Sequence, residues 1–181
     1  MRKINVNLIQ KIVAELCIKA NIKLRSDIFL SLKESLKREK NPRAKRMLGI
    51  LIENAALAKK EFLPICQDTG MAVIFFEIGQ DIYFTGGLLN KAVNDGVRDG
   101  YLKGNLRKSV VRDPFNRINT NTNSPAVIHY EIVKGNKLKI TVFPKGFGSE
   151  NKSVISMFLP TAEEPEIDKF IINAVKNAGP D

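Results

Sequence analysis

The chain has 181 residues, 44% of them hydrophobic and 27% charged, a balance that is typical of a globular protein and argues against a disordered or low-complexity chain. No apolar run approaches the ~18 residues of a membrane-spanning helix, and polar residues interrupt the N-terminus too often for a secretory signal, so no membrane association is expected. Two cysteines are too few for a disulfide scaffold, which makes a reducing, cytoplasmic compartment the expected one.

The net charge of +10 is concentrated in the first third of the chain. Residues 1–60 carry 15 Lys or Arg and 5 Asp or Glu, whereas residues 61–181 carry 14 of each kind. Such a bias fits a nucleic-acid partner, a solvated basic face on helices, or a surface that faces an acidic partner chain. Nucleic-acid modules usually interleave aromatic and basic residues, but residues 1–60 hold no Tyr and no Trp. A basic nucleic-acid-binding module is therefore the less favoured alternative.

Three helices are predicted in the basic first third. Apolar side chains recur at helical spacing over residues 5–20. Ser26 is expected to cap a second helix that ends near residue 38. Asn41 followed by proline has the pattern of a cap and a first helical residue, which predicts a third helix to about residue 60.

Strands and a further helix are predicted from residue 62 onward. Residues 72–78 form a continuous apolar run that is typical of a buried strand, and residues 82–84 predict a short second strand. A helix is expected over residues 88–102. Residues 103–125 show no period, and a loop of this length inside a compact domain is usually functional or disordered. Because both flanks are well patterned, we expect a functional loop.

The last part of the chain is predicted to contain a hairpin and a helix. Residues 127–133 and 138–143 have strand patterns, and the Gly135-Asn136 pair between them predicts a hairpin turn. Residues 154–159 fit either a strand or a short helix. Thr161 and Glu164 form a capping box, which predicts a helix over residues 163–176. A Gly-Pro pair at positions 179 and 180 then predicts a helix stop.

These elements predict an α+β fold in a single domain over residues 1–181. Residues 1–60 would be its basic helical part, packed on a mostly antiparallel sheet from residues 61–181, with additional helices. The site loops would meet at the edges of that sheet.

Two cysteines and one histidine are the first candidates for chemistry. Cys17 lies on the apolar stripe of the first predicted helix, where a small buried hydrophobe is the favoured interpretation. Cys66 precedes a buried strand in a loop, where it fits a nucleophile, a metal ligand or a buried thiol in a turn. A nucleophilic cysteine usually has a histidine partner, but His129 sits in a strand pattern and is interpreted as structural.

Two further loops carry groups that suit an anion. The 103–125 loop holds several arginines, including Arg107, and arginine binds carboxylates or phosphates bidentately; the alternative is a solvated loop with Asp113-Pro114 as its turn. Residues 145–149 contain two glycines, two positions apart, and this spacing lets backbone N–H groups approach an anion closely. This second loop matches neither a Walker A motif nor GxGxxG, so specific nucleotide binding is not supported. Together the loops suggest a site for a small carboxylate or phosphate ligand.

Three sequence blocks in this order and spacing resemble the iron–sulfur hydro-lyases, namely class I fumarate hydratase and the alpha subunit, or N-terminal region, of L(+)-tartrate dehydratase. The resemblance covers nearly the whole chain. The blocks are Cys66-Gln67-Asp68-Thr69-Gly70 ahead of an apolar strand, Arg112-Asp113-Pro114 with Arg117, Asn119, Thr120, Asn123 and Pro125-Ala126, and Lys145-Gly146-Phe147-Gly148-Ser149-Glu150-Asn151-Lys152.

The resemblance implies an oxygen-labile [4Fe–4S] cluster held by three cysteines, with one iron left open as a Lewis acid. Water would be added to or removed from a short dicarboxylate, either fumarate or tartrate. Cys66 would be one cluster ligand. Asp68 would contact the substrate and exchange a proton with its hydroxyl group. The stretch from Asn119 to Asn123 would brace the site. Substrate contacts are implied for Gln67, Asp68, Arg107, Gly146 and Gly148.

One departure from the family pattern concerns the cluster. The family carries its other two cluster cysteines further along, and no cysteine follows Cys66 here. The closing residues 177–181 resemble the family sequence just ahead of the second ligand. We therefore expect a truncated alpha-type chain that holds no cluster and has no activity by itself. The expected partners are a beta subunit or C-terminal beta domain, within an oligomer.

Overall fold

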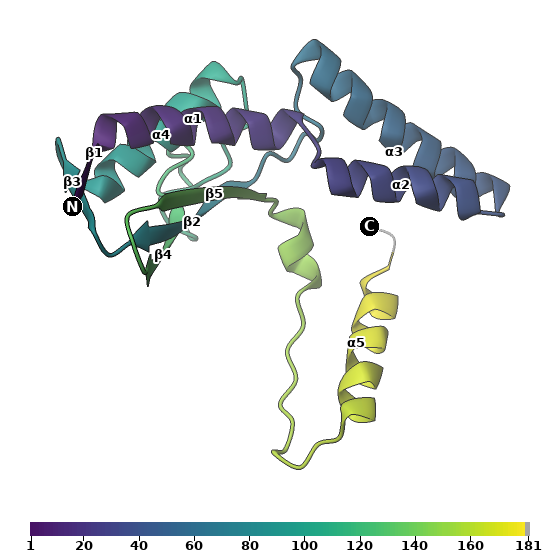
Figure 1. Ribbon diagram of the computed structural model, residues 1–181. Coiled ribbons are helices and arrows are strands. Elements are labelled where there is room, and N and C mark those ends of the chain that lie inside the picture. The colour runs from purple at the N-terminus through teal and green to yellow at the C-terminus, as the bar shows by residue number, and fades with distance from the viewer. Residues whose placement is uncertain (180–181) are drawn as a thin grey trace. The chain divides into compact units, whose positions relative to one another are not determined.

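The computed structural model describes residues 1–179, apart from the side chains of residues 149 and 150. The chain divides into two compact units, Met1–Gly146 and a smaller one that begins at Phe147. The first unit contains four helices and both sheets among its described residues (Figure 1). The expected α+β class is confirmed.

The three helices expected in the first third are present. They are α1 (Val6–Ile22), α2 (Ser26–Arg38) and α3 (Pro42–Glu61). Asn41 caps α3 as predicted, because its side-chain oxygen accepts hydrogen bonds from the backbone N–H groups of Arg43 and Ala44. The predicted cap at Ser26 is wrong: Ser26 is already helical, and Arg25 precedes α2 without a side-chain cap bond.

The strands form a mixed arrangement instead of the expected mostly antiparallel sheet. β1 (Arg2–Asn5), which the sequence analysis missed, pairs in parallel with β3 (Ile82–Thr85). The second sheet has the order β4-β2-β5, from β4 (Val127–Val133), β2 (Met71–Gly79) and β5 (Leu138–Lys145). β4 is parallel to β2, and only β5 is antiparallel to it.

The predicted hairpin between β4 and β5 is therefore wrong, because β2 lies between them. The connection after β4 crosses the end of β2 at Gly79. A Cβ on Gly79 would lie 2.3 Å from the Gly135 carbonyl oxygen, so the crossing chain occupies the space of a side chain. Gly79 N–H also donates to the Lys137 carbonyl oxygen at 2.8 Å. The Gly135-Asn136 turn thus carries the chain across the central strand.

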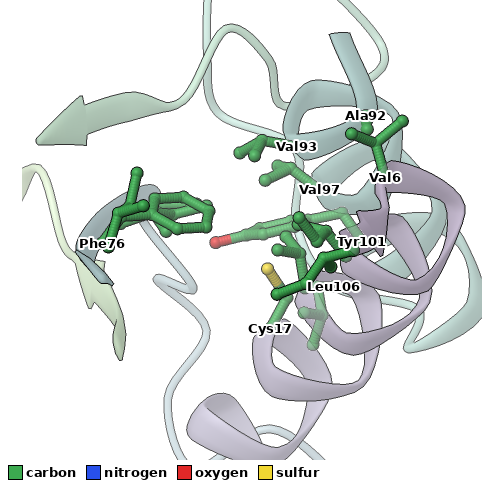
Figure 2. Close-up of a cluster of buried hydrophobic side chains, with 14 residues drawn as sticks. Val6, Cys17, Phe76, Ala92, Val93, Val97, Tyr101 and Leu106 are labelled. Atoms are coloured by element: carbon green, nitrogen blue, oxygen red, sulfur yellow. The ribbon is translucent and has the colours of Figure 1, made fainter. Parts of the chain in front are cut away.

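The core lies between α1, α4 (Leu89–Lys103) and one face of β2 (Figure 2). β2 alternates, with its even-numbered side chains buried and Phe75 exposed on the other face. α1 packs on α4 and on β5, whereas α2 and α3 pack chiefly on each other. Of the three basic helices, only α1 therefore takes the expected place against the sheet. The most deeply buried side chains include Ile9, Val13, Cys17, Ile74, Phe76, Val93, Val97, Tyr101 and Leu106.

The contact between α1 and α4 depends on a glycine. A Cβ on Gly100 would lie 2.7 Å from the backbone oxygen and 3.0 Å from the Cα of Ala14. Gly100→Ala must therefore push the helices apart, and we expect a loss of about 1–3 kcal/mol in the free energy of unfolding. Urea denaturation would measure it.

The matched control is Gly49→Ala, at a glycine inside α3 whose added Cβ would meet nothing within 4 Å. This variant should gain about 0.5–1 kcal/mol, because alanine favours a helix interior over glycine. Equal losses in both variants would contradict the close packing of α1 on α4.

The second unit contains a short 3-10 helix, η1 (Gly148–Lys152), and α5 (Glu164–Ala178). The helix predicted over residues 163–176 is confirmed, but the capping box is wrong: Glu163 is the cap residue and makes no side-chain cap bond. The strand or helix expected over residues 154–159 is absent from this stretch, whose apolar side chains are exposed. Position 180 of the expected helix stop lies outside the described residues. No described helix combines the length and the apolar character needed to cross a bilayer.

Candidate active site

Cys66 lies on an irregular segment between α3 and β2. Its start is anchored by two hydrogen bonds: Ile65 N–H donates to the Asn21 carbonyl oxygen at 2.9 Å, and Asn54 Nδ2 donates to the Ile65 carbonyl oxygen at 2.9 Å. The Cys66 thiol is exposed and donates to Gln67 Oε1 at 3.5 Å. The structure thus presents the thiol on a fixed piece of backbone that is open to solvent.

Asp68 and Gly146 lie against each other. Asp68 is half-buried, and its Oδ1 accepts a hydrogen bond from Gly70 N–H at 3.0 Å. A Cβ on Gly146 would lie 3.0 Å from Asp68 Oδ2, so a side chain at this position would crowd the Asp68 carboxylate. Gly70 has φ +61, and its own Cβ would lie 2.2 Å from the Lys145 carbonyl oxygen. The end of β5 is therefore pressed against the segment that carries the thiol and the carboxylate.

The long loop over residues 104–126 reaches the same place from another side. Thr69 Oγ1 donates to the Arg107 carbonyl oxygen at 2.8 Å, which fixes the Arg107 backbone beside the Cys66 segment. The Arg107 side chain is exposed. Within the loop, Asn119 Nδ2 donates to the Lys108 carbonyl oxygen at 2.9 Å. Asn119 thus links two parts of this loop.

Asn123 joins the loop to the Cys66 segment. Its side chain is fully buried, and its Oδ1 accepts from the N–H groups of Ser109 at 2.8 Å and Val110 at 3.2 Å. Its Nδ2 donates to the Gly70 carbonyl oxygen at 2.9 Å. Both sides of one amide are therefore used to hold two loops together.

Tyr101 was not among the residues predicted for the site. This side chain on α4 has no exposed surface, and its hydroxyl donates to the carbonyl oxygens of Thr69 at 2.7 Å and Gly70 at 3.2 Å. Burial raises the pKa of the Tyr101 hydroxyl far above its usual value, so it stays a donor. Its place on the apolar stripe that includes Val93 and Val97 predicts a buried hydroxyl that needs a partner, but the sequence does not show which partner.

A cavity of about 350 Å³ opens beside the thiol. Cys66 and Asp68 line it together with Lys23, Arg25 and Phe143. The Arg25 guanidinium is paired with Asp27, so Lys23 is the cation with the freer charge at this cavity among the described residues. The Lys23 ammonium group suits an anionic ligand at this cavity, where the exposed Cys66 thiol and the Asp68 carboxylate also lie.

The structure brings together five of the residues predicted for the site. Cys66, Gln67 and Asp68 are consecutive, and the contacts above add Gly146 and the backbone of Arg107. Gly148 belongs to the second unit and is described there by itself. Among the side chains that the structure describes, no group of three His, Cys, Asp or Glu residues lies close enough to hold a metal ion.

Cys17 and His129 occupy structural positions, as expected. Cys17 has no exposed surface and lies in the core, where burial raises the pKa of its thiol to about 12. His129 lies on β4, and its ring stacks on that of Phe75 with the centroids 4.9 Å apart.

This contrast predicts selective alkylation. At pH 8 only about 1 in 10⁴ of a thiol with a pKa near 12 is thiolate, and burial also blocks access to Cys17. We expect iodoacetamide to modify Cys66 at least ~100-fold faster than Cys17. Peptide mass spectrometry over a time course measures both rates. Comparable rates in the folded protein would contradict the burial of Cys17.

Comparison with known proteins supplies family relationships. The family model described as Fumarate hydratase (Fumerase) matches residues 10–181. A putative L(+)-tartrate dehydratase subunit alpha from Methanocaldococcus jannaschii is 33% identical over 177 residues, which cover 94% of this chain and 62% of that protein. An aerobic class I fumarate hydratase from Escherichia coli K12 is 40% identical over 131 residues, or 71% of this chain and 24% of that enzyme. Fumarate hydratase 2 from Leishmania major is 33% identical over 132 residues, or 71% and 23%. The chain thus spans about three fifths of the first relative and about a quarter of the other two.

Proposed function

This chain belongs to the fumarate hydratase family, and we propose that it forms the alpha-type, N-terminal part of a hydro-lyase that reversibly adds water to fumarate to give malate. The observation that carries the proposal is the convergence of the Cys66–Asp68 segment, Gly146 and the Arg107 backbone, with Cys66 and Asp68 lining a cavity. A hydro-lyase for a short dicarboxylate needs an anion site and a group that moves a proton, and this place supplies both.

Each residue of the site has a proposed role. Asp68 contacts the substrate and transfers the proton, since its half-buried carboxylate lines the cavity. Arg107 pairs with a substrate carboxylate through its exposed guanidinium. Gln67 binds the substrate beside them. Gly146 and Gly148 are proposed to offer backbone N–H groups to the same anion.

The proposed cofactor is a [4Fe–4S] cluster in the complete enzyme. Cysteine thiolates hold such clusters, and the exposed Cys66 fits one ligand position. The described residues do not fit the whole cluster, because the other cysteine of this chain, Cys17, is buried in α1 and the described side chains contain no three-ligand group. We therefore propose that the remaining ligands come from sequence outside this chain. A bound cluster would supply a Lewis-acidic iron.

The proposed partners follow from the same reasoning. A relative that is named a subunit alpha supports a beta subunit, or a beta domain in a longer chain, as the partner. An oligomer is proposed for the complete enzyme. The proposed location is the cytoplasm.

L(+)-tartrate is the second candidate substrate. One observation favours it: the tartrate dehydratase subunit from M. jannaschii matches 94% of this chain, whereas the E. coli fumarate hydratase matches 71%. The water would then be removed from a hydroxy acid that has one more hydroxyl group than malate.

The test is an anaerobic assay of the complete protein, purified with any partner chain, on fumarate and on L(+)-tartrate. Turnover of fumarate that is lost on exposure to air supports the proposal. Turnover of tartrate alone transfers the assignment to the second candidate. No turnover of either acid by iron-loaded protein would contradict both.

A further inference from the structure

We infer that Tyr101 and Asn123 are positioning residues, whose buried hydrogen bonds fix the Cys66–Asp68 segment and the Arg107 loop in one geometry. The inference rests on the proposed function, because it concerns the same site. Neither side chain would touch the substrate. Each would act through the backbone that carries the reacting groups.

The hydrogen bonds of Tyr101 and Asn123 end on the backbone that follows Asp68. Three bonds converge on two consecutive carbonyl oxygens: Tyr101 reaches both Thr69 and Gly70, and Asn123 reaches Gly70. These carbonyl groups follow Asp68 directly in the chain. Their orientation therefore determines the direction of the backbone that presents the Asp68 carboxylate.

These hydrogen bonds form a closed ring. From Gly70 the path runs to Asn123, through its Oδ1 to the N–H groups of Ser109 and Val110, and along the backbone to Arg107. Thr69 Oγ1 closes the ring on the Arg107 carbonyl oxygen. A movement of one loop must therefore break a buried bond or carry the other loop with it.

The side chains that form this ring are buried. Tyr101 and Asn123 have no exposed surface, and Thr69 is 2% exposed. In Figure 2 the Tyr101 ring lies inside the hydrophobic cluster, with its oxygen directed away from α4 toward Phe76. Water cannot readily replace a donor in such a place, and a buried carbonyl without a partner is costly. The ring consequently favours one loop arrangement strongly.

The test uses variants that each remove one donor. Tyr101→Phe keeps the ring and deletes the hydroxyl. Asn123→Asp keeps an acceptor for Ser109 and Val110 but removes the N–H donor to Gly70. The matched controls are Tyr130→Phe, which loses the hydroxyl contact with Asn90, and Asn94→Asp, which keeps the Oδ1 acceptor for Ala126 N–H and loses its Nδ2 bond inside α4.

The readout is amide hydrogen exchange in the complete protein, together with kcat and KM on its substrate. We expect Tyr101→Phe and Asn123→Asp to speed exchange over residues 66–70 and 107–110 by at least about tenfold, because local opening becomes easier. Exchange in α1 and β4 should stay within about twofold of wild type in Tyr101→Phe. The controls should leave residues 66–70 unchanged, and kcat/KM should fall at least ~10-fold only in the two test variants.

Three outcomes would overturn the inference: unchanged exchange over residues 66–70 in both test variants, faster exchange across the whole core in Tyr101→Phe, or faster local exchange with unchanged kcat/KM. Failure of the proposed function would give a different result. Wild-type protein would then turn over neither acid, but its hydrogen-exchange pattern could still be measured. Tyr101→Phe keeps the test decisive if the buried carboxylate of Asn123→Asp prevents folding.

Discussion

Replacing Phe76 by alanine is expected to lower the free energy of unfolding by about 3–5 kcal/mol. Phe76 is 1% exposed on β2, the central strand of its sheet, and its ring lies 5.4 Å from that of Tyr130. The neighbouring strands pair with β2 on both sides, so the sheet cannot collapse easily into the cavity left by the missing ring. Urea denaturation of the purified protein would measure the loss.

Phe75→Ala is the matched control, because it deletes the same ring from the next position of the same strand. Phe75 is 45% exposed and stacks on His129 on the opposite face. Its loss should cost only about 0.5–1.5 kcal/mol. Similar losses in the two variants would contradict the assignment of the core to the Phe76 face of β2.

Asp68→Asn is expected to reduce the proposed hydro-lyase turnover by about 10²–10⁴-fold, the usual contribution of a general acid or base. Asparagine can still accept the hydrogen bond from Gly70 N–H, so the turn should survive while the proton-transferring carboxylate is lost. Anaerobic kcat measurements on the complete enzyme, with its thermal midpoint recorded alongside, would separate catalysis from stability.

Asp81→Asn provides the comparison for Asp68, since Asp81 is an exposed residue at the turn before β3. This variant should keep wild-type kcat. If Asp68→Asn also retains full kcat, another group transfers the proton and the role proposed for Asp68 is wrong.

The local features of the fold were predictable, and the long-range ones were not. Helical periodicity and the Asn41-Pro42 pair predicted α1 and α3 closely, because a helix is stabilised by residues near in sequence. The partner of β5 depends on residues far apart in the chain. Gly135-Asn136 therefore suggested a hairpin, although the chain at this turn crosses β2 at Gly79. β1 has only four residues and showed no strand pattern of its own.

The candidate site shows the same division. The Cys66–Gly70 segment was a weak signal from its residue types alone, and the family resemblance singled it out. The bracing role of the 119–123 stretch stays a prediction, and within that stretch Asn123 has a buried amide that bonds to Gly70. Tyr101 could not be assigned to the site from sequence, because its hydroxyl acts on carbonyl groups more than thirty residues away. Hydrogen bonds of a side chain to distant backbone leave no spacing pattern in the sequence.

The most direct test of the account compares Cys66→Ser with Cys17→Ala in the complete enzyme, prepared without oxygen. Iron content and fumarate turnover are measured on each variant, with L(+)-tartrate as the second substrate. Cys66→Ser is predicted to lose most of its cluster and nearly all of its turnover. Cys17→Ala, which changes a thiol buried in the core, should keep both. Full turnover by Cys66→Ser would contradict the claim that this thiol is a cluster ligand at the active site.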